Sequence, residues 1–212
     1  MMKIFIIGSG NVGSQIAQAA VGAKHEVTIF SATPESLATV AGSTGAKAIG
    51  SIAEGAKNAE LVYLAVPGSV VADVAQELRP VIGTTPIIDG TNPLNATFSD
   101  LDIKGVSGAG DLQALLPQTP VVKAFNTVFA GRYSSPSQKG SSLQVFIAGD
   151  DQNAKNLVAT FAASLGFDPV DVGGLRFARS LEEMAFLNIS LNASKGLSWQ
   201  SAWSLTGPEK LA

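Results

Sequence analysis

The sequence predicts an α/β fold with a doubly wound, mostly parallel sheet and a small helical C-terminal portion. Glycines 8, 10 and 13 directly follow a short apolar run, and similar apolar runs alternate with helix-like segments along most of the chain. From Leu175 onward, apolar residues recur every three or four positions, as in a helix. We therefore expect a Rossmann-type domain over residues 1–172, and a helical portion over residues 173–212 that packs on it and forms a substrate pocket or a dimer contact.

The first strand, turn and helix carry the most specific pattern. Residues 3–30 read KIFIIGSGNVGSQIAQAAVGAKHEVTIF, in which the run Ile4 to Ile7 is the expected strand. Gly8 permits a tight turn, Gly10 lets the backbone approach a pyrophosphate, and Gly13 lets the helix pack closely on the strand. A purely structural glycine turn is the alternative. The predicted dinucleotide site consists of Gly8, Ser9, Gly10, Asn11, Val12 and Gly13.

The end of the second strand, Glu26 to Phe30, indicates which dinucleotide is bound. A carboxylate there would bond the ribose hydroxyls of NAD and repel a 2′-phosphate. This chain has Ser31, Ala32 and Thr33 instead, so nothing repels the phosphate and two hydroxyls can donate to it. The turn therefore favours NADP over NAD. Thr33 also fits a helix cap before Pro34, and both roles are compatible.

Further strands and helices follow in alternation. The expected strands are Ala46 to Ile49, Glu60 to Val66, Pro86 to Asp89, Pro120 to Phe125, Leu143 to Ala148 and Pro169 to Val172. The expected helices are Thr33 to Ala41, Ser51 to Asn58, a helix that Ser69 caps and that runs to about Leu78, Ala109 to Leu116, and one from Asp150 or Asp151 to Leu165. The ligand crevice of such a sheet lies at the carboxyl ends of its central strands. We therefore expect Val66 and Pro67 beside the nicotinamide.

Several single residues invite a role that a simpler explanation also covers. A helix cap or a hydrogen bond within the turn explains Asp89. The ammonium of Lys123 could reach the sheet edge or a ligand, but as an isolated charge it is expected to be solvated. His25 lies away from the crevice and is expected to be structural. Residues 131–142 (GRYSSPSQKGSS) are expected to be a mobile surface loop that connects rather than covers the site. Trp199 and Trp203 indicate a terminal segment that packs on the chain or on a second copy.

Composition excludes several classes of protein. The chain is 46% hydrophobic and 15% charged, has a net charge of −3, and contains no Lys/Arg cluster that would indicate nucleic acid binding. It has no cysteine, so disulfides and thiolate chemistry are excluded. The first apolar run is too short for a signal peptide, and no run is long enough to span a membrane, so a cytoplasmic location is expected. We identify no metal ligands and no catalytic acid, base or nucleophile.

Six segments together resemble one family. They are IGSGNVG at the first turn, Ser31-Ala32-Thr33, AVP at Ala65 to Pro67, TNPL at Thr91 to Leu94, KAFNT at Lys123 to Thr127, and DVGGLRFARSLEEMA from Asp171. The chain resembles, over nearly its whole length, the NADP oxidoreductases that use the deazaflavin coenzyme F420, to which the cytosolic domain of animal metalloreductases is related.

The resemblance implies a site as well as a fold. NADP would lie across the strand ends, with Ser31 and Thr33 on the 2′-phosphate and Ala65, Val66 and Pro67 by the nicotinamide. Asn92, Asn126 and Leu175 would border the pocket of a flat flavin-like or deazaflavin partner. The family often has arginine where this chain has Ala32, and its loss removes a bidentate phosphate ligand. We expect a weaker preference for NADP, and the acceptor could be a flavin, a quinone or a metal chelate.

Hydride transfer between NADP(H) and a small molecule suits this chain, because the nicotinamide supplies the difficult chemistry. One alternative is an imine reductase similar to pyrroline carboxylate reductases, although the residues after Gly174 are too few for their long helical dimerisation domain. Another is a redox sensor that binds NADP(H) without turnover, in keeping with the missing acid or base. A homodimer is compatible with all three.

Overall fold

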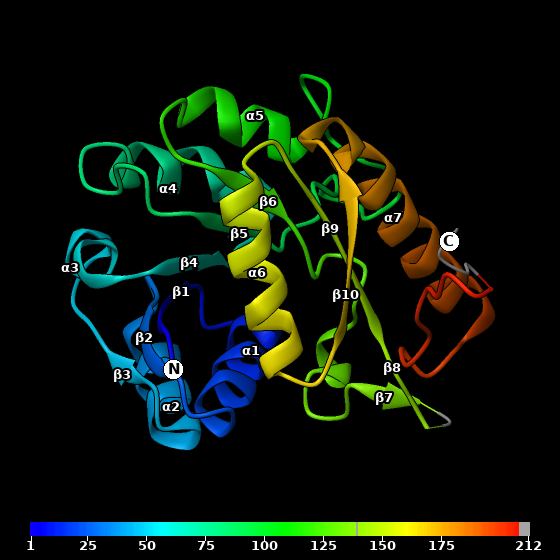
Figure 1. Cartoon of the computed structure of the whole chain (residues 1–212), viewed down its shortest axis with the longest axis horizontal. Helices are drawn as coiled ribbons and strands as arrows, with labels where there is room; N and C mark the ends of the chain where they lie inside the picture. Colours follow the sequence, from blue (N-terminus) through cyan, green and yellow to red (C-terminus); the bar gives the residue numbers. More distant parts are fainter. Residues whose placement is uncertain (139, 208–212) are drawn as a thin grey trace, which may run out of the picture.

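The centre of the protein is an eight-stranded sheet (Figure 1). The structure is a computed structural model that describes residues 1–138 and 140–207. The strands of this sheet are β1 (Lys3–Ile7), β2 (Glu26–Phe30), β3 (Lys47–Ala48), β4 (Leu61–Leu64), β5 (Ile87–Asp89), β6 (Val121–Lys123), β9 (Gln144–Gly149) and β10 (Asp168–Gly173). Their order is β10-β9-β6-β5-β4-β1-β2-β3. The first six strands thus follow the order of a dinucleotide-binding sheet.

The direction of the strands confirms the predicted doubly wound, mostly parallel sheet. Strands β1 to β6 pair in parallel with one another. Only β9 runs antiparallel to its neighbour β6, and β10 is parallel to β9. The predicted strands exist, although β3, β4 and β6 are shorter than the apolar runs that indicated them.

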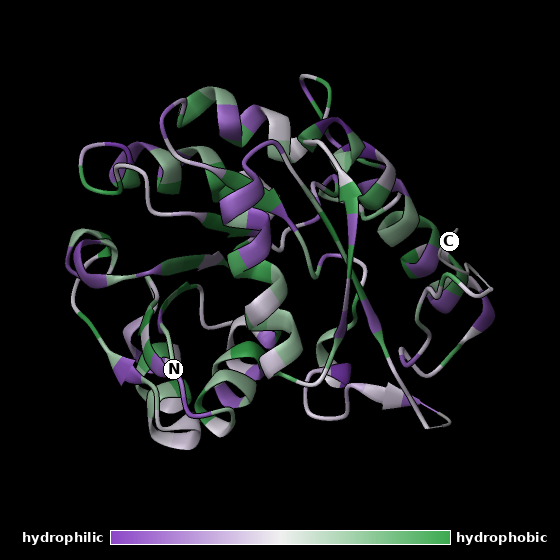
Figure 2. Ribbon diagram, in the orientation of Figure 1, coloured by the Kyte–Doolittle hydropathy of each residue, from purple (hydrophilic) through white to green (hydrophobic). Residues whose placement is uncertain are grey.

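Helices cover both faces of the sheet. They are α1 (Asn11–Gly22), α2 (Pro34–Thr44), α3 (Ile52–Asn58), α4 (Val71–Leu78), α5 (Gly108–Leu115), α6 (Gln152–Ser164) and α7 (Ala178–Lys195). Alternate side chains of each strand enter different cores. Ile4 and Ile6 pack with residues of α1 and α6, whereas Phe5 and Ile7 pack with residues of α3, α4 and α5. Figure 2 shows hydrophobic colours along the central strand β4 between these layers.

The strand register brings four turns to one edge of the sheet. Ile7 at the end of β1 is level with Leu64 at the end of β4. Leu64 is level with Asp89 of β5, which in turn is level with Lys123 of β6. The residues that follow these four strands therefore meet along one edge, where a dinucleotide binds in this kind of sheet.

Helix α7 buries a more polar face than its sequence indicated. Leu181 is buried as expected, but Leu187 and Leu191 are 50% and 40% exposed. The buried side of the helix carries Glu182, Asn188 and Asn192 instead. We expect the regularly spaced apolar residues to pack on the sheet or on a second copy of the chain. Leu181 packs within the chain, and a contact of the two exposed leucines with a second copy stays a prediction.

The segment after α7 folds back on the chain. The indole nitrogen of Trp203 donates to the carbonyl of Met184, at 2.9 Å. The backbone N–H of Leu205 donates to the side chain of Gln144 on β9. Packing on the chain itself is thus confirmed for this segment. The division of the protein at residue 172 stays a prediction.

The predicted loop over residues 131–142 has more structure than the sequence indicated. Within residues 131–142, Arg132 and Tyr133 are buried, and β7 (Ser137–Gln138) pairs with β8 (Ser141–Ser142). The prediction of a mobile surface loop is therefore wrong for its first residues, because aromatic and polar contacts fix them.

Ser69 does not cap a helix, contrary to the prediction. It lies inside the 3-10 turn η1 (Gly68–Val70), and α4 begins at Val71.

His25 has the structural contacts expected of it. Its Nδ1 accepts a hydrogen bond from the backbone N–H of Met2, and its Nε2 lies 2.8 Å from the hydroxyl of Ser164. The ring also meets Phe161 edge-on. These contacts tie the start of β2 to α6, at the opposite end of the strand from the crevice.

No helix in the described part of the chain is long and apolar enough to cross a membrane.

Candidate cofactor and substrate site

The glycine turn between β1 and α1 requires two of its glycines for steric reasons. Gly8 has a φ of +114°, and a Cβ there would collide with the backbone carbonyl of Ala65. A Cβ on Gly13 would collide with the carbonyl of Gly8. These contacts explain why the helix can start so close to the strand.

Gly10 differs from these two glycines. A Cβ at Gly10 would meet no other atom within 4 Å, so the protein leaves open space there. Gly10 is the N-cap of α1, without a capping side chain, and the first turn of the helix has no acidic residue. The N-terminal N–H groups of this helix are therefore suited to a bound anion such as a pyrophosphate.

The turn after β2 lies beside the glycine turn, because the N–H of Gly8 donates to the carbonyl of Phe30. Thr33 occupies the N-cap position of α2, but its side chain makes no capping hydrogen bond. Helix capping by the Thr33 hydroxyl is therefore wrong. The hydroxyl of Ser31 accepts from the N–H of Thr33, and Ala32 and Thr33 are exposed. The hydroxyl of Ser9 pairs with Ser36 of α2.

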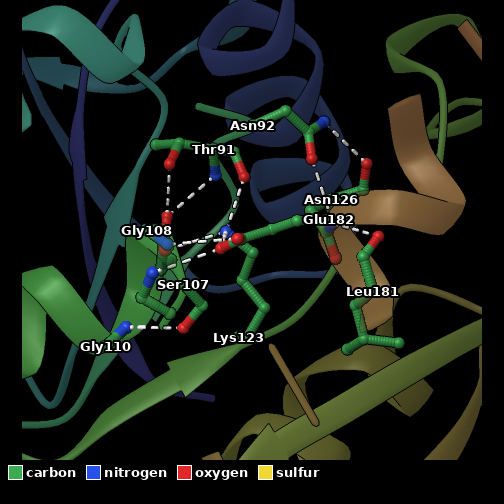
Figure 3. A network of polar contacts seen from close by, with 11 residues as sticks. Thr91, Asn92, Ser107, Gly108, Gly110, Lys123, Asn126, Leu181 and Glu182 are labelled. Carbon is green, nitrogen blue, oxygen red and sulfur yellow. Dashed lines mark hydrogen bonds and ion pairs between the residues drawn. The ribbon is translucent and has the colours of Figure 1, made fainter. Parts of the chain in front are cut away.

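A buried network of charges lies under the ends of β5 and β6 (Figure 3). Lys123 Nζ lies 2.9 Å from Asp89 Oδ2 and 2.9 Å from Glu182 Oε1, and it donates to the carbonyl of Thr91 at 2.7 Å. The side chain of Lys123 is 0% exposed, so the prediction of a solvated ammonium is wrong. The sequence could not show this, because Glu182 follows it by 59 positions.

The network also holds two helices. The carboxylate of Glu182 accepts from the N–H groups of Gly108 and Ala109 and so joins α7 to the N-terminus of α5. Asp89 Oδ1 accepts from the N–H and hydroxyl of Thr91, the turn bond expected of it. Burial by itself would lower the pKa of Lys123, but the two carboxylates outweigh that effect and raise the pKa above its usual value.

Two asparagines join the turns after β5 and β6. Asn126 Nδ2 donates to Asn92 Oδ1 at 3.0 Å and to the carbonyl of Leu181 at 2.9 Å. Asn92 Nδ2 donates to the backbone carbonyl of Asn126. Because both amide nitrogens point at backbone carbonyls, the orientation of each side chain is fixed. The pair holds α7 against the strand ends.

A cavity of about 520 Å³ opens between these elements. Four predicted site residues line it in part: Asn11 and Val12 at the start of α1, and Asn92 and Asn126 at the strand ends. The other lining residues are Gly90, Leu94, Phe98, Phe125, Thr127, Val128, Phe129, Ala130, Tyr133, Ala185, Asn188, Ile189, Ser190, Ala193 and Trp199. None of these described residues carries a charge. The cavity thus runs from the helix start of the glycine turn to α7.

The other predicted residues lie outside this cavity. Pro67 lines a second cavity, of about 450 Å³, between α4, α5 and residues 91–108, and Asn92 borders this second cavity as well as the first. The predicted site residues that line neither cavity are Gly8, Ser9, Gly10, Gly13, Ser31, Ala32, Thr33, Ala65 and Val66. They follow β1, β2 and β4 along the same sheet edge. Leu175 is buried in the core with α5 and lines neither cavity, contrary to expectation.

Sequence reasoning missed most of the aromatic lining. Phe98 and Phe129 follow β5 and β6 by several residues, in segments without any periodic pattern. The unusual aromatic content after α7 was the one signal that could have indicated Trp199. Among residues 1–138 and 140–207, no group of three or more His, Cys, Asp or Glu side chains could hold a metal ion.

Comparison with known proteins gives a consistent result. Residues 3–93 match the model of the family described as "NADP oxidoreductase coenzyme F420-dependent". The chain is similar to a solved structure from Arthrobacter sp. FB24, a candidate F420-dependent NADP reductase, with 28% identity, coverage of 93% of this chain and 96% of the other, and a TM-score of 0.84. It is also similar to the hypothetical protein SMa0349 of Sinorhizobium meliloti, with 32% identity, coverage of 82% and 86%, and a TM-score of 0.72.

A metalloreductase contains a related segment. The metalloreductase STEAP3 of Rattus norvegicus is 31% identical over 183 residues, which are 85% of this chain. The match spans only 36% of the length of that metalloreductase. An imine reductase of Pseudomonas sp. shares the fold, with a TM-score of 0.71 at 16% identity.

Proposed function

The chain belongs to the family of F420-dependent NADP oxidoreductases, and from this premise we propose that it transfers a hydride between NADP(H) and a flat, flavin-like or deazaflavin small molecule. The observation that supports this most strongly is the uncharged cavity that starts at the N-terminus of α1 and ends at α7. A cofactor anchored at the helix start would place its reactive half within reach of a ring in that cavity.

The cofactor would be held by the turns at the sheet edge. The N–H groups at Gly10 to Gly13 would bind the pyrophosphate, because the helix start has neither a capping side chain nor an acid. Ser31 and Thr33 would bond the 2′-phosphate of NADP from the end of β2. The nicotinamide half would extend the opposite way, past Ala65, Val66 and Pro67 toward Asn92 and Asn126.

The protein's part in the reaction would be binding and orientation. The bound nicotinamide supplies or accepts the hydride when the cofactor is present. The asparagine pair and the Lys123 network join the strand-end turns to α7, and this would keep the two reacting rings in position. The apolar lining would exclude water from the ring. Residues 1–172 would hold the cofactor, and residues 173–212 would complete the cavity through Ala185, Asn188 and Trp199.

Two measurements test this function. The first is titration of the protein with NADPH and with NADH, followed by nicotinamide fluorescence. NADPH should bind more tightly, and clearly tighter NADH binding would overturn the cofactor assignment. The second is NADPH oxidation with deazaflavin, FMN, quinones, ferric chelates and cyclic imines as acceptors. Turnover with ring acceptors supports the proposal, whereas tight NADPH binding without turnover on the whole panel would favour a redox sensor.

A further inference from the structure

Three aromatic residues of the cavity share an unusual backbone conformation. Phe98, Phe125 and Trp199 have φ values of 56°, 65° and 58°. Lys24 is the one other non-glycine residue in the described part of the chain with a positive φ. Bulky side chains avoid this region, and such strained conformations concentrate at functional sites. All three aromatic residues line the same cavity, although they come from three distant segments.

Two of these aromatic side chains are exposed despite their size. Phe98 is 69% exposed and Trp199 is 44% exposed, whereas Phe125 is 1% exposed and belongs to the core. Burial of apolar surface stabilises a protein in proportion to the area removed from water, so leaving two aromatic side chains exposed at one cavity forgoes part of that stabilisation. A bound apolar ring would recover part of it.

Polar side chains hold both exposed residues in place. The side chain of Asn95 accepts from the N–H of Ser99 and from the hydroxyl of Thr97, on either side of Phe98. The N–H of Trp199 donates to Asn192 Oδ1 at 3.0 Å. Asn192 is 1% exposed and is fixed in turn by Asn188 and Ser201. The strained conformations are thus built into the fold.

The surroundings indicate which ligand would fit. Phe129 meets Trp199 edge-on, with ring centroids 5.4 Å apart and planes at 76°. No described residue that lines the cavity is charged, and its volume of about 520 Å³ suits a small molecule. A charged chelate would lose its hydration there without gaining an ionic partner.

We propose that Phe98 and Trp199 are specificity-determining residues that form an aromatic binding surface for an uncharged planar ring, the hydride acceptor of this protein. The ring would be a quinone or the tricyclic ring of a flavin, which share flat apolar faces that stack on aromatic side chains. This inference rests on the proposed function for the role of the ring as acceptor. The binding itself can be tested without the cofactor.

The two tryptophans allow a direct binding measurement. Trp203→Phe leaves Trp199 as the sole tryptophan, because the chain contains two. This variant should be titrated with 1,4-naphthoquinone and with riboflavin, in the absence of NADPH. We expect saturable quenching of the Trp199 fluorescence by at least one of these rings, and no saturable quenching by ferric citrate. If neither ring quenches, or if ferric citrate quenches equally, the proposal is overturned.

Single variants then test the individual residues. Trp199→Ala and Phe98→Ala should each raise the KM for the ring acceptor about tenfold, since stacking on one aromatic side chain is worth about 1–3 kcal/mol. Trp199→Phe should keep most of the affinity. NADPH binding should change less than about twofold in all of them, which corresponds to well below 1 kcal/mol of binding free energy.

Leu197→Ala is the matched control, since Leu197 is an exposed apolar residue of the same segment that lines neither cavity. If Trp199→Ala and Phe98→Ala raise the KM no more than Leu197→Ala, their assigned role is wrong. Failure of NADPH to bind the unaltered protein would instead contradict the proposed function. The fluorescence titration would still decide whether the aromatic surface binds a ring.

Discussion

Lys123 Nζ lies 2.9 Å from Glu182 Oε1, and this contact joins the last residue of β6 to the first turns of α7 with both side chains 0% exposed. The same ammonium bonds Asp89, so one cation is shared by two buried carboxylates. Removing one partner of a buried ion pair leaves an uncompensated charge, which is far more costly than the pair itself is stabilising. The position of α7, and with it one wall of the cavity, depends on Lys123.

We therefore expect Lys123→Met to lower the free energy of unfolding by about 3–5 kcal/mol or to prevent folding. Chemical denaturation followed by circular dichroism measures this. The matched control is Lys155→Met, which breaks a pair whose Asp171 side chain is 43% exposed. Its cost should be nearer 1 kcal/mol, because water screens such pairs. Equal costs for the two variants would show that the Lys123 network is not the tether described above.

The two later glycines of the first turn should separate folding from binding. Gly10→Ala should leave stability within about 1 kcal/mol, because Gly10 has a φ of −71° and its Cβ would meet no atom within 4 Å. It should weaken NADPH binding about tenfold, since the methyl group would occupy the path of the pyrophosphate. Titration of nicotinamide fluorescence measures the affinity.

Gly13→Ala, in contrast, should lower the stability of the protein. Its Cβ would collide with the carbonyl of Gly8, and overpacking of this kind costs about 1–3 kcal/mol. Thermal denaturation should therefore distinguish the two variants. A Gly10→Ala protein that binds NADPH as tightly as the parent would show that the cofactor does not approach the turn at Gly10.

The fold could be predicted because its strongest signals are local. The glycine turn and the short apolar strands each depend on neighbouring residues, and the strand order of a dinucleotide-binding sheet follows from such units. The pocket could be predicted only in part. Asn92 and Asn126 are each the third residue after a strand, so the sheet edge places them.

The rest of the site depends on contacts between distant residues. Lys123 looked like an isolated charge until the fold brought Asp89 and Glu182 to it. Trp199 reaches the cavity only because a buried Asn192 accepts a hydrogen bond from its backbone. Neither the ion pairs of Lys123 nor the hydrogen bond between Trp199 and Asn192 leaves a periodic pattern in the sequence, so neither could be predicted without coordinates.

Ala32 should limit the preference for NADP. We expect Ala32→Arg to tighten NADPH binding about tenfold or more and to leave NADH binding nearly unchanged, because a charge-assisted bond to the 2′-phosphate is worth about 1.5–3 kcal/mol. Ala32→Gln is the control for side-chain length without charge, and it should change the ratio little. If Ala32→Arg tightens both cofactors equally, the residue does not face the 2′-phosphate.

The two tyrosines of the chain should resist ionisation together. The hydroxyls of Tyr63 and Tyr133 lie 2.9 Å apart in the interior, and burial raises the pKa of both above the usual value of 10.0. Because the pKa is higher in the folded protein than in the unfolded chain, the contribution of the neutral tyrosines to stability is fully present below about pH 10, the pKa of tyrosine in the unfolded chain. It is lost as the pH rises further. In the native protein, tyrosinate absorbance should therefore appear only when the protein unfolds.

Alkaline titration followed by ultraviolet absorbance and circular dichroism checks this. The chain contains two tyrosines, so the whole signal reports on this pair, and in denaturant both should titrate near pH 10. Tyr133→Phe should leave Tyr63 silent in the folded state, because burial is the largest cause of the raised pKa of Tyr63, whose side chain is 0% exposed. One tyrosine that titrates near pH 10 while the circular dichroism is unchanged would contradict the burial of the pair. Because Tyr133 lines the cavity, its neutral hydroxyl also keeps that wall uncharged across the physiological pH range.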